Sequence, residues 1–295
     1  MKVLVLGSRS GSAAPSHGAA QAPQRTQSSV ALSADGVSWL LLNASPDIGQ
    51  QIRANPVLHA QPGATDTPVK AVVLMDAQIE HVAGLLSLHG PKSGPPLELY
   101  ATPCVFEDLT SGLPLLQTLQ HYCGVRWHMV PVAGESRVAP FRVAGFESLC
   151  FTAIATQGPA PAYATYRDDH TVGANIALYI EDSVSGQSLF YSPGPARLGE
   201  EELRWMREAD CLLLDAALDA ALDASDGTEP TAPAADGVGT MSASMIQLLN
   251  RLSNRKVLAH LGPEGKGTGA LEPDAKHALK RQGIELAHDG MEIEL

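Results

Sequence analysis

The chain has 295 residues, and its 20 Lys and Arg against 32 Asp and Glu give a net charge of −12. This acidic balance, without a basic stripe, excludes nucleic acid as an expected partner. The apolar content of 44% allows a sizeable core, and no uncharged apolar stretch reaches about 18 residues, so we expect no membrane span. Because Met1–Gly7 lacks the pattern of a secretory signal, we expect a cytoplasmic protein.

Short apolar runs bounded by Gly, Pro, Asp or Asn recur along the chain and predict strands. They are Val3–Leu6, Ser29–Leu32, Trp39–Asn43, Ala71–Met75, Leu97–Ala101, Phe151–Ala155, Asn175–Ile180, Ser188–Tyr191, Cys211–Asp215 and Lys256–Leu261. Apolar residues at helical spacing predict helices between some of these strands. The expected helices are Ile79–Leu88, Glu200–Glu208, Ser242–Leu252 and Asp274–Gln282.

This mixture of strands and helices predicts an α/β fold, an αββα sandwich in which two sheets lie face to face with helices outside. We expect one domain over residues 1–295, with the small-residue stretches Arg9–Gln24 and Ala216–Gly239 as irregular loops. A doubly wound nucleotide-binding fold is disfavoured. Gly7–Ser12 supplies only fragments of the GxGxxG fingerprint, and no acidic residue follows at the required distance.

Several predicted strands end in a polar residue that could bind a ligand. These residues are Asn43 and Asp47 after one strand, Asp76 after another, Asp215 and His260. Polar side chains at strand ends collect along one edge of a sandwich, so we expect a site there.

The turn after Ala71–Met75 is the most informative of these places, because Asp76, Glu80 and His81 lie within six positions. Two carboxylates and an imidazole suit Fe(II), Mn(II) or Zn(II). Alternatively, Asp76 is the N-cap of the following helix, with Glu80 and His81 exposed in its first turns. The spacing leaves both interpretations open, and the strand ends at Asp215 and His260 favour the metal.

The same turn resembles the HxHxDH pattern of the metallo-β-lactamase superfamily. Asp76 and Gln78 stand where the two leading histidines would be, Glu80 stands where the Asp would be, and His81 matches. This form of the pattern is similar to that of the protein B family of pyrroloquinoline quinone (PQQ) biosynthesis. Further stretches resemble that family in order and spacing: Arg25–Ser29, Leu41–Ile48, Leu99–Pro103, Phe190–Gly194 and Ala287–Leu295.

The resemblance implies a sandwich of metallo-β-lactamase type and Fe(II)-dependent, O₂-using hydroxylation of a tyrosine-derived intermediate formed from a Glu–Tyr precursor. It implies one divalent metal and not two, because Tyr191–Gly194 lacks the bridging Asp that the superfamily usually has about there. Fe²⁺ is favoured over Zn²⁺ as this metal. The implied ligands are Asp76, Glu80, His81, Asp215 and His260. The sequence does not decide the oligomeric state, and a homodimer is one option.

Departures from the family pattern leave other functions open. Ser10–Ala20 has no cysteine cluster, so we expect no structural zinc, and Thr240 replaces a family histidine. The second hypothesis is therefore a non-catalytic protein that binds or transports PQQ or a precursor, with Arg9, Arg25 and Arg167 as candidate partners of its carboxylates. A metal-dependent hydrolase is the third, disfavoured by the shortage of histidines around Asp76.

Weaker candidates have ordinary structural explanations. His170 with Arg167 could touch an acidic substrate, but a solvated turn explains it better, and His288–Gly290 predicts a turn between two terminal strands. His121 and His128 flank Trp127 in a region that the pattern does not place. The four scattered cysteines Cys104, Cys123, Cys150 and Cys211 are expected to be buried thiols.

Overall fold

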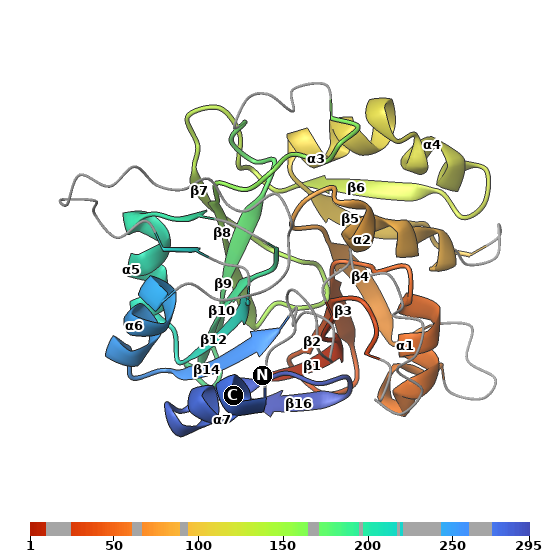
Figure 1. The fold of residues 1–295 in the computed structure, drawn as a ribbon. Helices are drawn as coiled ribbons and strands as arrows, with labels where there is room; N and C mark the ends of the chain where they lie inside the picture. Colours follow the sequence, from red (N-terminus) through yellow and green to blue (C-terminus); the bar gives the residue numbers. More distant parts are fainter. Residues whose placement is uncertain are drawn as a thin grey trace.

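The computed structural model describes residues 1–9, 25–60, 67–88, 94–164, 171–194, 197–216, 219–220, 243–259 and 273–295. Two seven-stranded sheets lie face to face, with helices on both outer sides (Figure 1). The predicted αββα sandwich is therefore confirmed. In the described part of the chain, no helix has the length and apolar character needed to cross a membrane.

The first sheet is antiparallel at one end and parallel at the other. Its order is β16 (Met291–Glu294), β1 (Lys2–Gly7), β2 (Ser29–Ser33), β3 (Trp39–Leu42), β4 (Val69–Val73), β5 (Leu97–Ala101) and β6 (Val125–Met129). The strands from β3 to β6 are parallel, so their carboxyl ends share one edge of the sheet.

The second sheet has the same mixed character. Its order is β15 (Ile284–Leu286), β14 (Arg255–Ala259), β12 (Cys211–Asp215), β10 (Ser188–Ser192), β9 (Ile176–Asp182), β8 (Leu149–Ala155) and β7 (Val138–Phe141). The strands from β10 to β15 are parallel. A separate two-stranded sheet pairs β11 (Arg197–Leu198) with β13 (Asp219–Ala220). The strand β13 lies inside Ala216–Gly239, which we expected to be irregular.

Helical segments cover the outer face of each sheet (Figure 1). Those on the first sheet are α1 (Ile48–Ala54), η1 (Pro56–Leu58), α2 (Ile79–Val82), η2 (Ala83–Ser87), α3 (Pro103–Glu107), the π-helical turn η3 (Asp108–Gly112) and α4 (Leu115–Gln120). Those on the second are α5 (Glu200–Glu208), α6 (Ala243–Arg251) and α7 (Pro273–Arg281).

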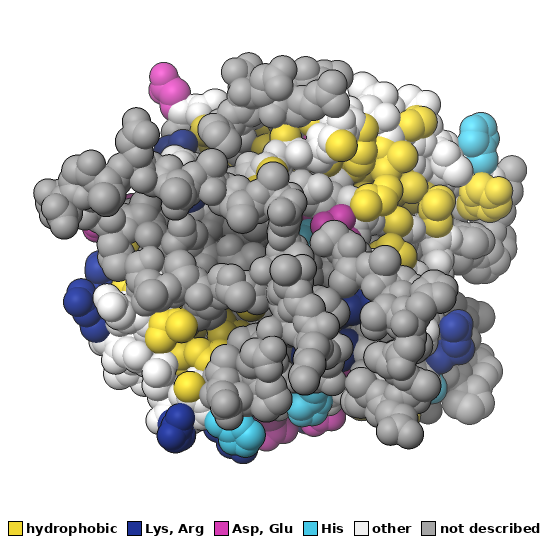
Figure 2. All heavy atoms as spheres, in the orientation of Figure 1, with side chains coloured by type: hydrophobic (Ala, Val, Ile, Leu, Met, Phe, Trp, Pro, Cys, Tyr) yellow, Lys and Arg dark blue, Asp and Glu magenta, His cyan; other side chains and the backbone are white. Residues whose placement is uncertain are grey.

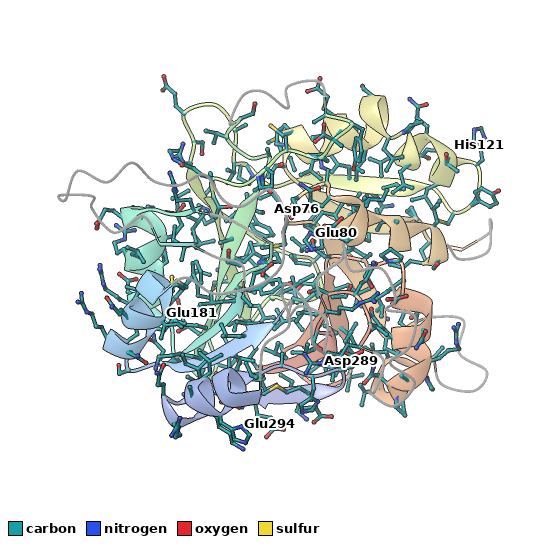
Figure 3. All side chains as sticks on the ribbon, in the orientation of Figure 1. Asp76, Glu80, His121, Glu181, Asp289 and Glu294 are labelled. Atoms are coloured by element: carbon teal, nitrogen blue, oxygen red, sulfur yellow. The ribbon has the colours of Figure 1, made fainter. Side chains whose placement is uncertain are left out.

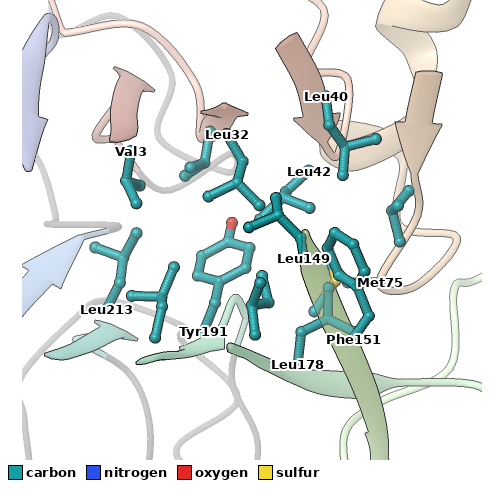
Figure 4. Close-up of a cluster of buried hydrophobic side chains, with 14 of the residues drawn as sticks. Val3, Leu32, Leu40, Leu42, Met75, Leu149, Phe151, Leu178, Tyr191 and Leu213 are labelled. Atoms are coloured by element: carbon teal, nitrogen blue, oxygen red, sulfur yellow. The ribbon is translucent and has the colours of Figure 1, made fainter. Parts of the chain in front are cut away.

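The main core lies between the sheets, and Figure 4 shows Tyr191 packed among aliphatic side chains from both. Strands bury both faces because each sheet is covered twice. In β12, Leu213 faces the core between the sheets, whereas Leu212 and Leu214 face the helices. This double burial explains why the strands read as continuous apolar runs instead of alternating.

The predicted helix Ile79–Leu88 is wrong in its length, because the α-helical part ends at Val82 and a 3₁₀ segment follows. Gly84 is the cause. A Cβ on Gly84 would lie 2.0 Å from the carbonyl oxygen of Ser45, so the segment packs directly on the loop after β3. The Gly84 N–H also donates to the Ala44 carbonyl at 2.9 Å.

The predicted turn at His288–Gly290 is confirmed, and Asp289 in it ties the two ends of the described chain together (Figure 3). Its carboxylate accepts hydrogen bonds from the backbone N–H and the hydroxyl of both Ser8 and Thr26, at 2.6–2.9 Å. Gln51 then donates to the Gln27 carbonyl at 2.6 Å. Two stretches that resemble the PQQ protein B family, Arg25–Ser29 and Ala287–Leu295, thus meet in one hydrogen-bonded network.

Asp289→Ala is expected to lower the free energy of unfolding by about 2 kcal/mol, because four donors lose a charged acceptor. Urea denaturation measures the change. The control is Asp35→Ala, which removes a carboxylate that accepts from Val37 and Ser38 in an exposed turn. An equal or larger loss in the control would contradict the special role of Asp289.

Cys211 is expected to resist alkylation in the folded protein. Its side chain is fully buried in β12, and this burial raises the pKa of its thiol to about 12, so almost no thiolate forms at pH 8. Iodoacetamide labelling followed by peptide mass spectrometry should find half-buried Cys150 modified first. Labelling of both cysteines at one rate before unfolding would contradict the expectation.

Candidate metal centre

Asp76 and His81 form a buried pair at the edge where β4 ends. The Nδ1 atom of His81 lies 2.8 Å from Oδ1 and 2.9 Å from Oδ2 of Asp76. The two residues are only 3% and 4% exposed. Because a carboxylate accepts hydrogen bonds, this geometry assigns a proton to Nδ1 of His81, and an ion held by both Nδ1 and Asp76 would replace that proton.

The interpretation of Asp76 as a helix N-cap is wrong. The N-cap of α2 is Gln78, and no side chain caps it. Asp76 instead accepts the Gln78 N–H at 2.9 Å, which closes the turn that leads into α2. His81 is buried and not exposed in a first helical turn, because the loop after β3 lies against it.

That loop fixes both ends of the turn. Asn43 adopts a φ of 63° and its Oδ1 accepts the Met75 N–H at 2.9 Å, so the chain just before Asp76 is held. The Ala44 N–H donates to the His81 carbonyl at 2.7 Å, so α2 is held as well. The sheets also join here, because the Ile176 N–H donates to the Met75 carbonyl at 2.9 Å.

The turn after β10 covers the pair. Gly194 has a φ of 82°, and a Cβ on it would lie 3.9 Å from both Asp76 Oδ2 and His81 Cε1. Gly194 therefore faces the pair, with room for about one methyl group between them. A larger residue at 194 would be strained in its backbone and would crowd the space beside these two side chains.

Asp215 approaches from the second sheet. It ends β12, is 4% exposed and belongs to the same strand face as Leu213, which looks toward the first sheet. Burial favours the neutral imidazole of His81, but Asp76, Glu80 and Asp215 outweigh that effect and raise its pKa. Burial raises the pKa of Tyr191 too, and Asp76 and Asp215 add to the shift.

Glu80 is half-buried on α2, and Figure 3 shows it next to Asp76 in the middle of the molecule. Tyr163 lies on the other side of the turn, where its hydroxyl donates to the Ala77 carbonyl. Burial raises the pKa of Tyr163, and the charges of Asp108, Asp76 and Glu80 raise it further. Ile79 on α2 and Leu86 on η2 are exposed apolar residues, and Figure 2 shows apolar surface over α2 and α4.

The chemistry of this donor set fits a divalent cation. The charged groups that shift the pKa of His81 are Asp76, Glu80 and Asp215, all of them acids. Carboxylates and an imidazole are ligands that divalent first-row metals accept, so the residue types suit such an ion. Within the described residues, however, no three His, Cys, Asp or Glu side chains form a complete ligand set.

The structure brings together some of the predicted metal ligands but not all of them. Asp76 and His81 are in contact, while Glu80 and Asp215 act on His81 through their charge. His260 lies outside the described residues. So do Arg167, His170, Thr240 and the stretch Ser10–Ala20 on which the expectation of no structural zinc rests.

Two other histidines are placed away from the site. His121 caps the C-terminus of α4, and His128 on β6 lies 2.6 Å from Glu98. Sequence reasoning missed the contributions of Gly194 and Tyr163. The Pro193–Gly194 pair signalled a turn but not what it covers, and nothing around Tyr163 indicated its position.

Comparison with known proteins shows the superfamily to which the chain belongs. Residues 38–260 match the family model described as the beta-lactamase superfamily domain. The structure is similar to zinc-bound PqqB from Methylobacterium extorquens, with 27% identity, a TM-score of 0.74 and full coverage of both chains. A diphosphatase of the PhnP family, 17% identical with a TM-score of 0.64, shares the fold.

The sequence narrows this class to one family. The coenzyme PQQ synthesis protein B of Cupriavidus necator is 39% identical, with 99% of each chain covered. That of Stutzerimonas stutzeri is 38% identical over the whole of both chains. The chain belongs to the coenzyme PQQ synthesis protein B family, which supports a role in PQQ synthesis.

Proposed function

We propose that the protein is a metal-dependent hydroxylase that acts in PQQ synthesis on a tyrosine-derived precursor, with Fe²⁺ as its metal. The observation that carries the proposal is the buried Asp76–His81 pair, surrounded by acidic charge at the end of β4. Family membership supplies the pathway. Zn²⁺ is an alternative metal, since the related structure from Methylobacterium extorquens is zinc-bound.

Asp76 and His81 would hold the ion, with Asp215 and His260 completing its ligands and Glu80 as a further carboxylate. When bound, iron supplies the redox chemistry that hydroxylation by O₂ requires. The burial of Asp76 and His81 would limit the access of water to the ion. The exposed apolar residues Ile79 and Leu86 would receive the aromatic ring of the precursor.

Oxygen uptake tests this function. Protein loaded with Fe²⁺ under anaerobic conditions, then given the Glu–Tyr dipeptide, ascorbate and O₂, should consume oxygen and yield a product one oxygen atom heavier. Ascorbate supplies the two electrons that reduce the second oxygen atom to water. Iron-loaded protein that consumes no oxygen above the rate without dipeptide would contradict the hydroxylase assignment.

A second candidate is a non-catalytic protein that binds or transports PQQ or its precursor. Thr240, which replaces a histidine of the family pattern, favours it. PQQ is a tricarboxylate, and Arg9 and Arg25 are candidate partners for its carboxylates. Metal-stripped protein would then bind PQQ stoichiometrically by absorbance titration. A hydrolase is less favoured, because the site has carboxylates where two-ion hydrolases have histidines.

A further inference from the structure

A cleft is lined by residues of β6 and β7, which are edge strands of the two sheets, and of the segment that follows β7. Its volume is about 860 Å³, which is enough for a small organic molecule. The residues that give it chemical character are Tyr100, His128, Met129, Phe141, Arg142 and Glu147. None of them belongs to the candidate metal centre.

The floor of this edge cleft is aromatic and rigid. Tyr100 stacks on His128 with ring centroids 4.4 Å apart and planes 12° apart, and Phe141 lies 6.3 Å from Tyr100. The Tyr100 hydroxyl accepts the Ala144 N–H at 3.1 Å, which fixes the phenol ring. Met129 is 57% exposed at the side of the cleft. Such a floor favours an aromatic ring, which gains from stacking as well as from burial.

The rim carries two opposite charges side by side. Nη1 of Arg142 donates to the carbonyls of Glu147 and Leu149, at 3.3 and 3.2 Å, so the guanidinium is held against the backbone of the residue that bears the acid. Oε1 of Glu147 accepts the Gly145 N–H at 2.9 Å. That hydrogen bond lowers the pKa of Glu147, which keeps its carboxylate charged.

We propose that the edge cleft binds a free aromatic α-amino acid. Its ring would lie on half-buried His128, which Tyr100 supports from behind, and on exposed Met129, while its carboxylate would pair with Arg142 and its ammonium with Glu147. An α-amino acid carries both charges on one carbon atom, which matches adjacent partners on the rim. An aromatic acid without an ammonium would leave Glu147 without a counter-charge, and an aromatic amine would leave Arg142 without one.

Calorimetric titration of the purified protein tests the class of ligand. L-phenylalanine is compared with 3-phenylpropionate, which lacks the ammonium, with 2-phenylethylamine, which lacks the carboxylate, and with L-cyclohexylalanine, which lacks the aromatic ring. Phenylalanine is expected to bind at least tenfold more tightly than each analogue. No saturable binding of phenylalanine would overturn the proposal, and so would an analogue that binds equally well.

Variants place the ligand in the cleft. Arg142→Ala and Glu147→Gln should each weaken phenylalanine binding at least tenfold without changing the thermal unfolding temperature, because both side chains are exposed. The matched control is Arg207→Ala, which removes the same charge from the exposed face of α5. Unchanged affinity in Arg142→Ala, or an equal loss in Arg207→Ala, would overturn the assignment of the site.

Discussion

His81→Ala protein is expected to retain less than a tenth of the iron that wild-type protein binds after anaerobic loading and desalting. The His81 imidazole is an aromatic nitrogen ligand in direct contact with Asp76. Without it, the ion would lose this ligand, and carboxylates bind first-row metals less tightly than a mixed set does. Elemental analysis of the loaded protein gives the metal content per chain.

Two further variants separate metal loss from unfolding. Alanine at 81 leaves Asp76 buried without its partner, which costs roughly 3–5 kcal/mol. His81→Asn keeps a hydrogen-bond donor toward Asp76 but no ring nitrogen, so it should fold and still lack iron. The control His121→Ala removes an exposed imidazole at the far end of α4 and should bind iron normally (Figure 3). Wild-type iron content in folded His81→Asn would contradict the assignment.

Gly84→Ala is expected to lower the free energy of unfolding by at least about 3 kcal/mol and to reduce iron binding as well. The added Cβ would lie 2.0 Å from the Ser45 carbonyl oxygen and 2.7 Å from that of Ala44, both backbone atoms that cannot turn aside. The segment would have to move away from the loop after β3. His81 would move with it, because its carbonyl accepts the Ala44 N–H.

The comparison is Gly49→Ala in α1. A Cβ on Gly49 has its nearest neighbour at 3.6 Å, the flexible end of Arg53, so nothing needs to shift. Alanine is the better helix former, and this variant should gain roughly 0.5–1 kcal/mol in urea denaturation. The account of Gly84 would be wrong if both variants changed the free energy of unfolding in the same direction.

The sequence predicted the fold well wherever strands are buried on both faces. Cys211–Asp215 and Ser188–Tyr191 are continuous apolar runs with clear turn residues after them, and both agree with the structure within one residue. That the chain forms one domain over residues 1–295 stays a prediction.

The edge strands β6 and β7 were missed for a physical reason. Val125–Met129 places Arg126 and His128 among apolar residues, because its outer edge meets solvent, and Val138–Phe141 contains Pro140. Both features are common at sheet edges and weaken the strand pattern. The short helix α1 escaped because Ile48–Ala54 buries few of its residues.

The candidate site was predicted in part. The clustering of Asp76 and His81 followed from their spacing, and the approach of Asp215 followed from its place at a strand end. The hydrogen bond of Asn43 to Met75 and the cover that Gly194 provides could not be predicted, because both depend on contacts between distant segments. The N-cap interpretation failed because Asp76 lies two residues before the true cap at Gln78.

The central claim is that the turn with Asp76 and His81 meets the strand ends at Asp215 and His260 around one divalent ion. Anomalous diffraction at the iron edge, from crystals of anaerobically loaded protein, tests it directly. The account predicts one strong peak at about 2.0–2.2 Å from a His81 nitrogen and an Asp76 oxygen. A peak elsewhere, or none at this pair in iron-loaded crystals, would contradict it.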